Sequence, residues 1–187
     1  MKAAFTKSRR AAAAALAERG ISMTESEFEL CIEKYRETVW SAAFCHVKNA
    51  ADADDITQDV FLKLYLHEGE LSGEHLKAWL LRCTVNRSID LLRSHWYRFS
   101  IPLDSIEPRQ SAEHSDSDKA DMLSSLFMKL SRNNRTVLYM HYYQGYSIAE
   151  TASILGISES AAGVRLMRGR KQLGKLLEKE GKEYHGL

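Results

Sequence analysis

The sequence lacks the features by which membrane proteins, disulfide-bonded proteins and metal sites are recognised. No apolar run approaches the ~18 residues that a membrane-spanning helix needs, so we expect no membrane insertion. Only three cysteines occur in 187 residues, and none of them belongs to a CxxC pair. Because helical apolar patterns surround all three, we expect Cys31, Cys45 and Cys83 to be buried, reduced thiols of a cytoplasmic protein, with no metal site and no disulfide framework.

Proline is scarce, and both prolines fall in one segment. Pro102 and Pro108 lie within residues 99–121, where helical periodicity disappears and serines and acidic residues accumulate. We predict a flexible linker there. The rest of the sequence shows neither the alternation typical of strands nor a repeat with the period of a solenoid, so the expected fold class is all-α.

The net charge of +1 hides an uneven distribution along the chain. Residues 1–98 carry 14 basic and 14 acidic side chains, residues 99–121 carry 2 and 6, and residues 122–187 carry 10 and 5. A basic C-terminal third indicates attraction to phosphates, whereas the acidic segment indicates repulsion from them or contact with a basic protein surface. The chain therefore needs partners of both signs.

Apolar residues at helical spacing predict two small helical domains joined by the linker. The first domain contains three amphipathic segments, of which the third has an apolar stripe of Ala78, Leu81, Val85 and Leu92. The basic, alanine-rich start of the chain has no clear hydrophobic face, and Met23 is an alternative start. The expected organisation is an N-terminal extension (1–24), a first domain (25–98), the linker (99–121), a second domain (122–180) and a tail (181–187).

A pair of helices with a glycine corner is predicted within the second domain. Ser147 and Glu150 have the spacing of a capping box, and Gly156 is placed to take the left-handed conformation that ends a helix. Ser158 then caps the next helix. This pattern is typical of a helix-turn-helix, whose second helix enters the major groove of DNA. An ordinary helical bundle with a basic end remains the alternative, and Gly163 favours it because glycine weakens a helix by about 1 kcal/mol.

The second of these helices has two distinct sides. Its inner side is expected to consist of Ala162, Leu166, Gly169, Leu173 and Leu176. The opposite side is a candidate phosphate-facing surface, made of Ser160, Gly163, Arg165, Met167 and Arg168, with Arg170, Lys171 and Lys175 towards its C-terminal end.

Longer phrases in both domains resemble a known family. LSRNNRTVLYMHYYQGYSIAETASILGIS and VRLMRGRKQL resemble region 4 of bacterial RNA polymerase sigma factors, particularly those of the extracytoplasmic-function (ECF) group. In the first domain, DADDITQDVFLKLY resembles the polymerase-binding helix of region 2, and LKAWLLRCTVNRSIDLLRS resembles the promoter-melting helix that follows it. The matches occur in the family's order and cover most of residues 26–178.

The resemblance implies a protein that binds core RNA polymerase, recognises the minus-ten and minus-thirty-five promoter elements and promotes transcription initiation. Such a protein carries out no covalent chemistry and needs no cofactor. The implied partners are the β′ clamp helices and the β subunit of the polymerase, promoter DNA, and an anti-sigma factor as a further candidate. The linker fits this interpretation, because 23 residues at ~3.3–3.6 Å each span roughly 80 Å, and two turns of DNA measure about 70 Å.

The resemblance also assigns candidate site residues. Those for polymerase binding are Asp55, Gln58 and Asp59. Those for the minus-ten element are Arg82, Asn86, Arg87 and Arg93. Those for the minus-thirty-five element are Ser158, Ser160, Arg165, Arg168 and Lys171. Trp96, Tyr97 and Phe99 are candidate stacking platforms for an unstacked base, Trp79 is expected in the core, and His67 and His75 are expected in solvent.

Two other classes of function stay open at this point. A helix-turn-helix regulator would bind duplex DNA as a dimer without polymerase, with residues 1–98 as a sensor or dimerisation domain. An enzyme that uses Cys45 and His46 has little support, because no spacing pairs a nucleophile with its base and no glycine-rich phosphate loop is present. The loop from Glu68 to His75 departs from the family's commoner form, so the identity of any captured base does not transfer.

Overall fold

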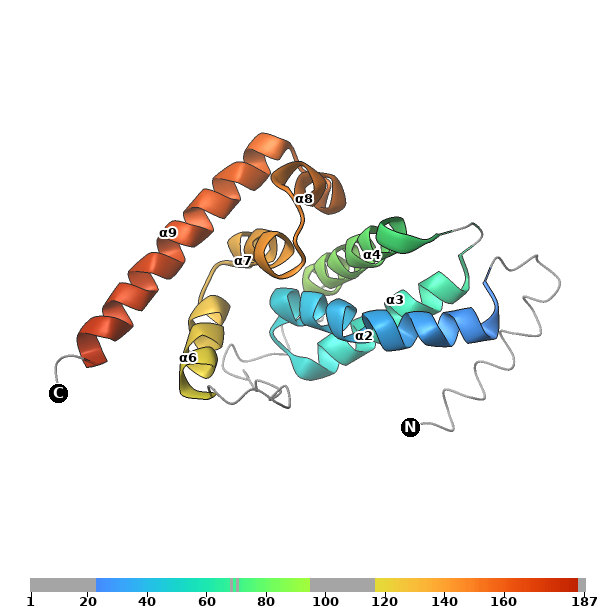
Figure 1. Cartoon of the computed structure of the whole chain (residues 1–187), viewed down its shortest axis with the longest axis horizontal. Helices are drawn as coiled ribbons and strands as arrows, with labels where there is room; N and C mark the ends of the chain where they lie inside the picture. Colours follow the sequence, from blue (N-terminus) through green and yellow to red (C-terminus); the bar gives the residue numbers. More distant parts are fainter. Residues whose placement is uncertain (1–22, 68, 70, 95–116, 185–187) are drawn as a thin grey trace.

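The computed structural model describes residues 23–67, 69, 71–94 and 117–184 of the chain, and within them the only regular elements are helices. The first domain contains α2 (Glu25–Val47), α3 (Ala50–Tyr65) and α4 (Gly73–Arg93). The second contains α6 (Ser117–Met128), α7 (Arg132–Leu138), the π-helical turn η1 (Tyr139–Tyr143), α8 (Ile148–Leu155) and α9 (Glu159–Tyr184). The expected all-α fold of two domains is confirmed (Figure 1).

Side-chain caps set the boundaries of the first two helices. Thr24 and Glu27 form a capping box at the start of α2, in which the Thr24 amide donates to Glu27 Oε2 at 2.7 Å. The helix ends at Lys48, whose φ of 59° is left-handed. Asn49 then caps α3, because its side-chain oxygen accepts from the Asp52 amide at 3.0 Å. Two residues thus suffice to turn the chain between these helices.

The core of the first domain lies where α2, α3 and α4 meet. Val39, Ile56 and Leu80 are at most 1% exposed in it. Phe61, whose role the sequence left undecided, is also buried in this core, and Trp79 packs against it while remaining half-buried. Three short amphipathic helices therefore bury one shared apolar centre.

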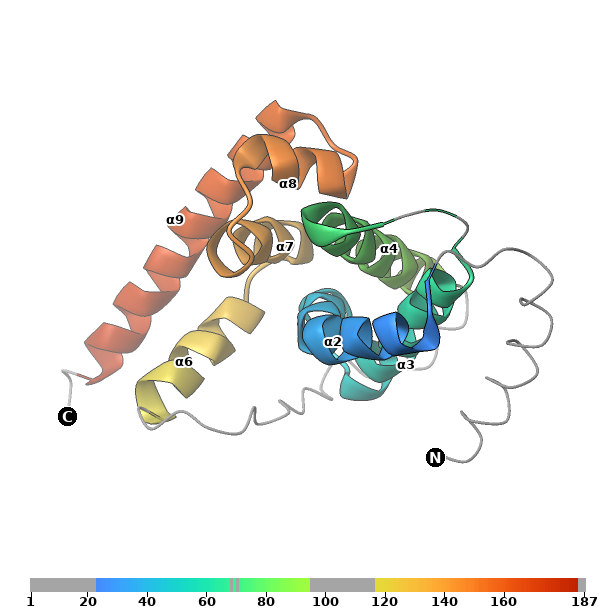
Figure 2. The same ribbon diagram turned by 45° about the vertical axis from the view of Figure 1, so that its right-hand side comes forward.

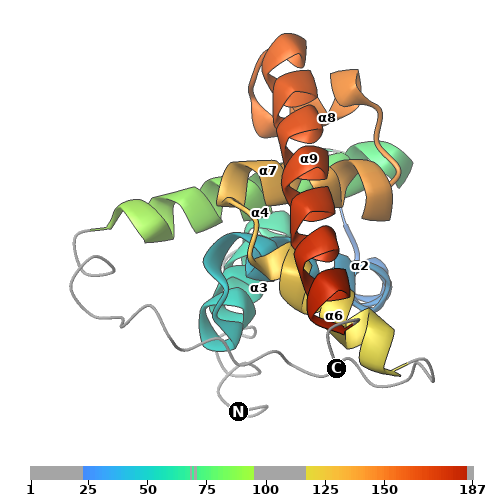
Figure 3. The ribbon, with the colours of Figure 1, turned by 90° about the vertical axis from the view of Figure 1, so that its left-hand side faces the viewer.

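In the second domain the long helix α9 packs against α7, α8 and α6 (Figure 3). Leu130, Val137, Leu138 and Leu166 form the apolar centre. Gly169 is needed there, since a Cβ added to it would lie only 2.6 Å from Leu138 Cδ1. α6 begins at Ser117, inside the segment predicted as a linker, and α9 continues to Tyr184, inside the predicted tail.

The two domains also pack against each other through a separate apolar cluster, which we call the interdomain cluster. It consists of Ala42, Cys45, Leu81, Val85, Tyr139, Met140, Tyr146 and Ile154, all buried. Figure 2 shows α7 and α8 lying over α2 and α4. The stripe that the sequence indicated on α4 is therefore divided, because Leu81 and Val85 face the second domain whereas Leu92 packs on the core of the first.

A buried arginine joins the domains beside this cluster. Arg135 of α7 is 1% exposed, and its Nε donates to the carbonyl of Cys45 on α2 at 2.6 Å. Next to it, Thr136 Oγ1 lies 2.9 Å from His46 Nε2. Burial, and then the nearby charges of Arg132 and Arg135, lower the pKa of His46 to about 4. His46 is therefore neutral at physiological pH.

We predict opposite effects for two alanine substitutions in α9. Gly169→Ala should lower the free energy of unfolding by about 1–3 kcal/mol, because the new methyl group collides with Leu138. Gly174→Ala has open space around it and should raise that free energy by about 0.5–1 kcal/mol, because glycine weakens a helix interior. Urea unfolding followed by circular dichroism measures both, and equal stabilities would contradict the close α7–α9 packing.

A second prediction concerns pH. The unfolded His46 has a pKa near 6.5 and the folded one about 4, so below pH 6.5 the unfolded chain binds a proton that the folded chain does not. The free energy of unfolding should therefore fall with decreasing pH in this window, with His46 contributing about 1.4 kcal/mol per unit. Comparing wild type with His46→Gln between pH 7 and pH 4.5 isolates this contribution, and parallel curves would show that His46 is not buried neutral.

Candidate functional site

One face of α3 is turned away from the core and carries three exposed polar side chains. Asp55, Gln58 and Asp59, the residues predicted for polymerase binding, are all exposed on it. The same face continues with Leu62 and Leu66, which are 51% and 47% exposed. These two leucines were not among the predicted site residues. The signal for them was present in the sequence, because both lie off the apolar stripe that α3 buries. An acidic start followed by an apolar end suits a protein surface better than a nucleic acid.

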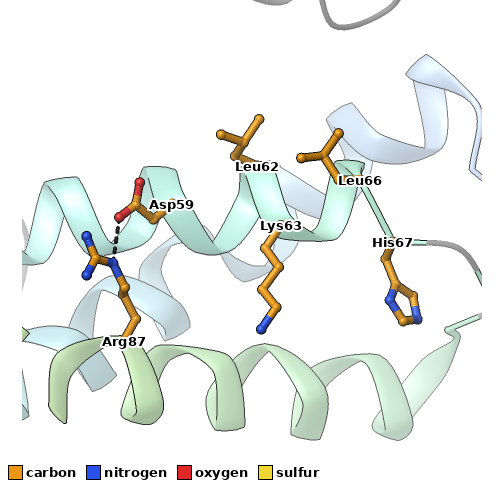
Figure 4. Close-up of a pocket in the computed structure, with 6 residues that line it drawn as sticks. All are labelled: Asp59, Leu62, Lys63, Leu66, His67 and Arg87. Carbon is orange, nitrogen blue, oxygen red and sulfur yellow. Dashed lines mark hydrogen bonds and ion pairs between the residues drawn. The ribbon is translucent and has the colours of Figure 1, made fainter. Parts of the chain in front are cut away.

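A shallow groove of about 540 Å³ lies between this face and α4 (Figure 4). Within it, Arg87 Nε donates to Asp59 Oδ2 at 2.7 Å, and both side chains are 46% exposed. Arg87, predicted to contact the minus-ten element, thus forms an ion pair with Asp59, predicted to bind polymerase. The groove is lined by Asp59, Leu62, Lys63, Leu66, His67 and Arg87.

His67 and Trp79 make a ring contact at one end of this groove. Their ring centroids are 5.0 Å apart, and the Lys63 amine lies 6.0 Å from the Trp79 ring centroid. His67 is therefore half-buried and less exposed than expected, whereas His75 is exposed as expected. Trp79 is occupied by these contacts and by the core, so it does not offer a free stacking face.

The polar side of α4 presents the remaining residues predicted for the minus-ten element. Arg82, Asn86 and Arg93 are exposed along it. Arg82 is engaged, because its Nη2 donates to the Ser153 carbonyl of α8 at 2.9 Å. Trp96, Tyr97 and Phe99 lie outside the described residues.

The helix-turn-helix is built as the sequence predicted. The Ser147 amide donates to Glu150 Oε2 at 2.9 Å, and hydrogen bonds from Ser147 lower the pKa of Glu150. Gly156 takes the left-handed conformation with φ of 64°. Ser158 caps α9, because its Oγ accepts from the Ala161 amide at 3.2 Å. The corner therefore places α9 at a defined angle to α8.

α9 also has the two sides that the sequence predicted. Ala162, Leu166 and Gly169 are buried, and Leu173 and Leu176 are half-buried. Of the residues predicted for the minus-thirty-five element, Arg165 is half-buried, and the exposed ones are Ser158, Ser160, Arg168 and Lys171. Met167 is 62% exposed between them. The surface has the cations that phosphate contacts require.

The structure adds an apolar groove of about 450 Å³ on the second domain, which the sequence analysis did not identify. It lies between α6, the turn η1 and α9. Tyr142 and Tyr143 are 56% and 63% exposed at its edge. The Tyr143 ring is held by the Phe127 and Tyr139 rings, each with its centroid 5.8 Å away. The groove is lined by Leu123, Phe127, Leu138, Tyr142, Tyr143, Arg170, Leu173, Gly174 and Leu177.

The described residues do not support an enzymatic use of Cys45 and His46. Burial raises the pKa of the Cys45 thiol to about 12, so it is not a thiolate near neutral pH. His46 is committed to Thr136 at the domain interface. The described part of the chain contains no group of His, Cys, Asp and Glu side chains that could hold a metal ion. None of its helices is long and apolar enough to cross a membrane.

We predict that the Asp59–Arg87 ion pair contributes little to stability. In a double-mutant cycle with Asp59→Asn and Arg87→Gln, the coupling energy should be at most about 1 kcal/mol, because both partners are exposed. It should fall further in 1 M salt. Urea unfolding of the four proteins measures it, and a coupling of several kcal/mol would mean that the pair is shielded from water.

Comparison with known proteins agrees with this arrangement. The family described as "Sigma-70 region 2" matches residues 31–98, and "Sigma-70, region 4" matches residues 120–173. RNA polymerase sigma factor SigZ of Bacillus subtilis is 33% identical over 135 residues, which cover 71% of this chain and 76% of SigZ. ECF RNA polymerase sigma factor SigM of Mycobacterium tuberculosis is 28% identical over 151 residues, covering 80% of this chain and 76% of SigM.

Two solved structures share the fold. CnrH, in complex with the cytosolic domain of CnrY, has a TM-score of 0.60 at 24% identity over 84% of this chain and 92% of that chain. The sigma factor RpoE of Bartonella quintana, in complex with the anti-sigma factor NepR, has a TM-score of 0.61 at 22% identity over 81% of this chain and 96% of that chain.

Proposed function

Because this chain belongs to the sigma-70 family of RNA polymerase sigma factors, within the ECF group, we propose that it binds core RNA polymerase and directs it to promoters. Its first domain would engage the minus-ten element and its second the minus-thirty-five element. It would act by binding alone, without covalent chemistry. Because promoters lie on chromosomal DNA, a protein with this role functions in the cytoplasm.

The exposed face of α3 carries the proposal for polymerase binding. Asp55, Gln58 and Asp59 would meet the basic clamp helices of the β′ subunit, and Leu62 and Leu66 would bury apolar surface beside them. Charge pairs of this kind favour correct docking and fast association, while the apolar contacts slow dissociation. The ion pair with Arg87 holds the Asp59 carboxylate on the side of α3 that faces α4.

The polar side of α4 is the proposed surface for the minus-ten element. Arg82, Asn86 and Arg93 are exposed there and could contact phosphates and base edges of the opened strand. Melting needs no catalysis, because tighter binding to the opened strand shifts the equilibrium towards it. Two arginines of the predicted set already have partners, because Arg87 pairs with Asp59 and Arg82 donates to the Ser153 carbonyl.

In the second domain, α9 is the proposed reader of the minus-thirty-five element. Ser158 and Ser160 lie at its N-terminal end, where recognition helices contact base edges. Arg165, Arg168 and Lys171 would contact phosphates, which makes DNA binding weaken steeply with salt. The apolar groove between α6 and α9 would accept an apolar helix of the polymerase β subunit, because its exposed tyrosines and leucines offer the surface that such a helix buries.

The length of chain between the domains is compatible with this division of work. Residues 94–116 join α4 to α6, and a chain of this length spans at most roughly 80 Å. Two promoter elements separated by two turns of DNA are about 70 Å apart. An anti-sigma factor is a further proposed partner. The similar structure of RpoE is a complex with the anti-sigma factor NepR, and that of CnrH is a complex with the cytosolic domain of CnrY.

The decisive test replaces residues on the α3 face. The double variant Gln58→Ala with Asp59→Lys should bind core polymerase about tenfold or more weakly, because it removes a polar contact and places a cation against a basic surface. Glu33→Lys, an exposed charge reversal on α2, is the matched control and should bind normally. Biolayer interferometry with immobilised core polymerase measures both.

Promoter-directed transcription by the reconstituted enzyme should decrease in parallel with binding. Unchanged binding of the double variant would refute the α3 interface. A dimer of the wild-type protein that bound duplex DNA specifically without polymerase would instead favour the regulator hypothesis.

A further inference from the structure

We infer that α9 reads the minus-thirty-five element through the methyl groups of thymines, and that Val164 and Met167 set this part of its sequence specificity. The choice of promoter element rests on the proposed function. The contacts themselves rest on which side chains the structure leaves exposed along the outer side of α9.

The outer row of α9 lies on the side of the helix turned away from its packing partners. It consists of Ser160, Val164, Met167 and Lys171, all of them exposed. Their spacings of four, three and four residues place them on one face of a helix. This face is opposite the buried Ala162 and Leu166. Because α9 forms one edge of the molecule (Figure 1), the outer row is the part of the helix that would enter a DNA groove deepest.

Two apolar side chains occupy the middle of this row. Val164 is 41% exposed and Met167 is 62% exposed. The side chains that read bases through paired hydrogen bonds, such as arginine, asparagine and glutamine, do not occur between Ser160 and Lys171 in the row. Val164 was assigned to neither side of α9 in the sequence analysis. The row therefore offers apolar surface where base edges would lie.

The major groove presents one apolar group, the C5-methyl of thymine. Other base edges would lose water against Val164 and Met167 without gaining a hydrogen bond, which is unfavourable. The two residues are three positions apart, or about 4.5 Å along a helix that rises 1.5 Å per residue. Successive bases of one strand are about 3.4 Å apart. The apolar pair therefore fits the methyl groups of two neighbouring thymines.

Cations on both flanks of the row would hold it in place on DNA. Arg168 and Lys175 lie on one flank, seven residues apart, and Arg170 lies on the other, and all three are exposed. Phosphate contacts of this kind position a helix without reading sequence. Ser160 and Lys171 add hydrogen-bonding groups before and after the apolar pair. Charge thus supplies affinity, while the apolar pair supplies the choice of sequence.

Gly163 leaves the surface beside the apolar pair without a side chain. A Cβ added to it would meet nothing within 4 Å among the described residues, so its packing does not require a glycine, unlike that of Gly169. A missing side chain lets a backbone approach its ligand closely. Gly163, which favoured an ordinary bundle in the sequence analysis, thus has a use on a reading helix.

Removing methyl groups from the DNA tests this inference. Sites are selected from duplexes with a randomised minus-thirty-five region, once with the full chain alone and once with the chain bound to core polymerase. Each thymine of a selected site is then replaced singly by uracil, which lacks only the C5-methyl. At two neighbouring positions uracil should weaken binding about fourfold, the loss expected for one buried methyl group. At the same positions, 5-methylcytosine should bind more tightly than cytosine by a similar factor.

Variants of the row connect each methyl group to a side chain. Val164→Ala and Met167→Ala should each abolish the uracil effect at one of the two positions, and circular dichroism should show unchanged folding because alanine favours a helix. Lys171→Ala is the matched control within the row. It should weaken binding to thymine and uracil DNA equally and reduce the salt dependence by about one phosphate contact. Leu30→Ala, at an exposed side chain of α2, should behave as wild type.

The outcomes separate this inference from the proposed function. A uracil effect that persists in both alanine variants would show that DNA shape is read instead of methyl groups, which overturns the inference. Selected promoter sites that tolerate uracil at every position would also overturn it, while the sigma function stands. Methyl-dependent sites selected by the chain alone, with no polymerase complex, would support the contacts of Val164 and Met167 and refute the proposed function. If neither condition selects any sequence, both are wrong.

Discussion

The buried guanidinium of Arg135 is the contact on which the relative placement of the domains depends. Removing a cation from water costs several kcal/mol unless its donors are satisfied, and here they donate to three carbonyls. Besides Cys45 on α2, the Met128 and Leu130 carbonyls accept from Arg135 Nη1 at 3.1 and 2.8 Å. The same side chain therefore organises the turn between α6 and α7 and attaches it to the end of α2. Burial beside this charge also keeps His46 neutral.

α4 shows how one helix can serve two cores and a surface. Leu76 and Leu80 face the core of the first domain, whereas Leu81 and Val85 face the second domain. The buried Thr84 and Ser88 hydroxyls each donate to a backbone carbonyl one turn earlier in α4, at 2.8 Å. These polar groups are therefore hydrogen-bonded without help from a neighbouring helix. The remaining side carries Arg82, Asn86 and Arg93, of which Arg82 also donates to the Ser153 carbonyl of α8. Because the helix is held on two sides, the orientation of its polar face is well defined.

The surfaces proposed for protein and for DNA are separated but physically linked. The α3 face and the α4 face meet at the Asp59–Arg87 ion pair, so a partner that engages Asp59 changes the environment of Arg87. In the second domain, the apolar groove and the basic surface both lie on α9, and Arg170 lines the groove. Each domain thus places the surface proposed for protein next to the surface proposed for DNA.

The sequence by itself determined the features that depend on neighbours a few residues apart. The capping box of Ser147 and Glu150, the left-handed Gly156 and the inner side of α9 all follow from local spacing, and the order of the family phrases gave the two domains. Only the tertiary structure decided which apolar stripe meets which partner. Leu81 and Leu80 are equally apolar in the sequence, yet one belongs to the interdomain cluster and the other to a domain core.

The same holds for Arg135, which the sequence counts as one more cation of a basic domain, and for Leu62 and Leu66, which it counts as helix formers. Burial is a property of the space around a side chain, and that space is filled by residues about a hundred positions away in the sequence. Periodicity can therefore assign a residue to a face of its helix, but not say what covers that face.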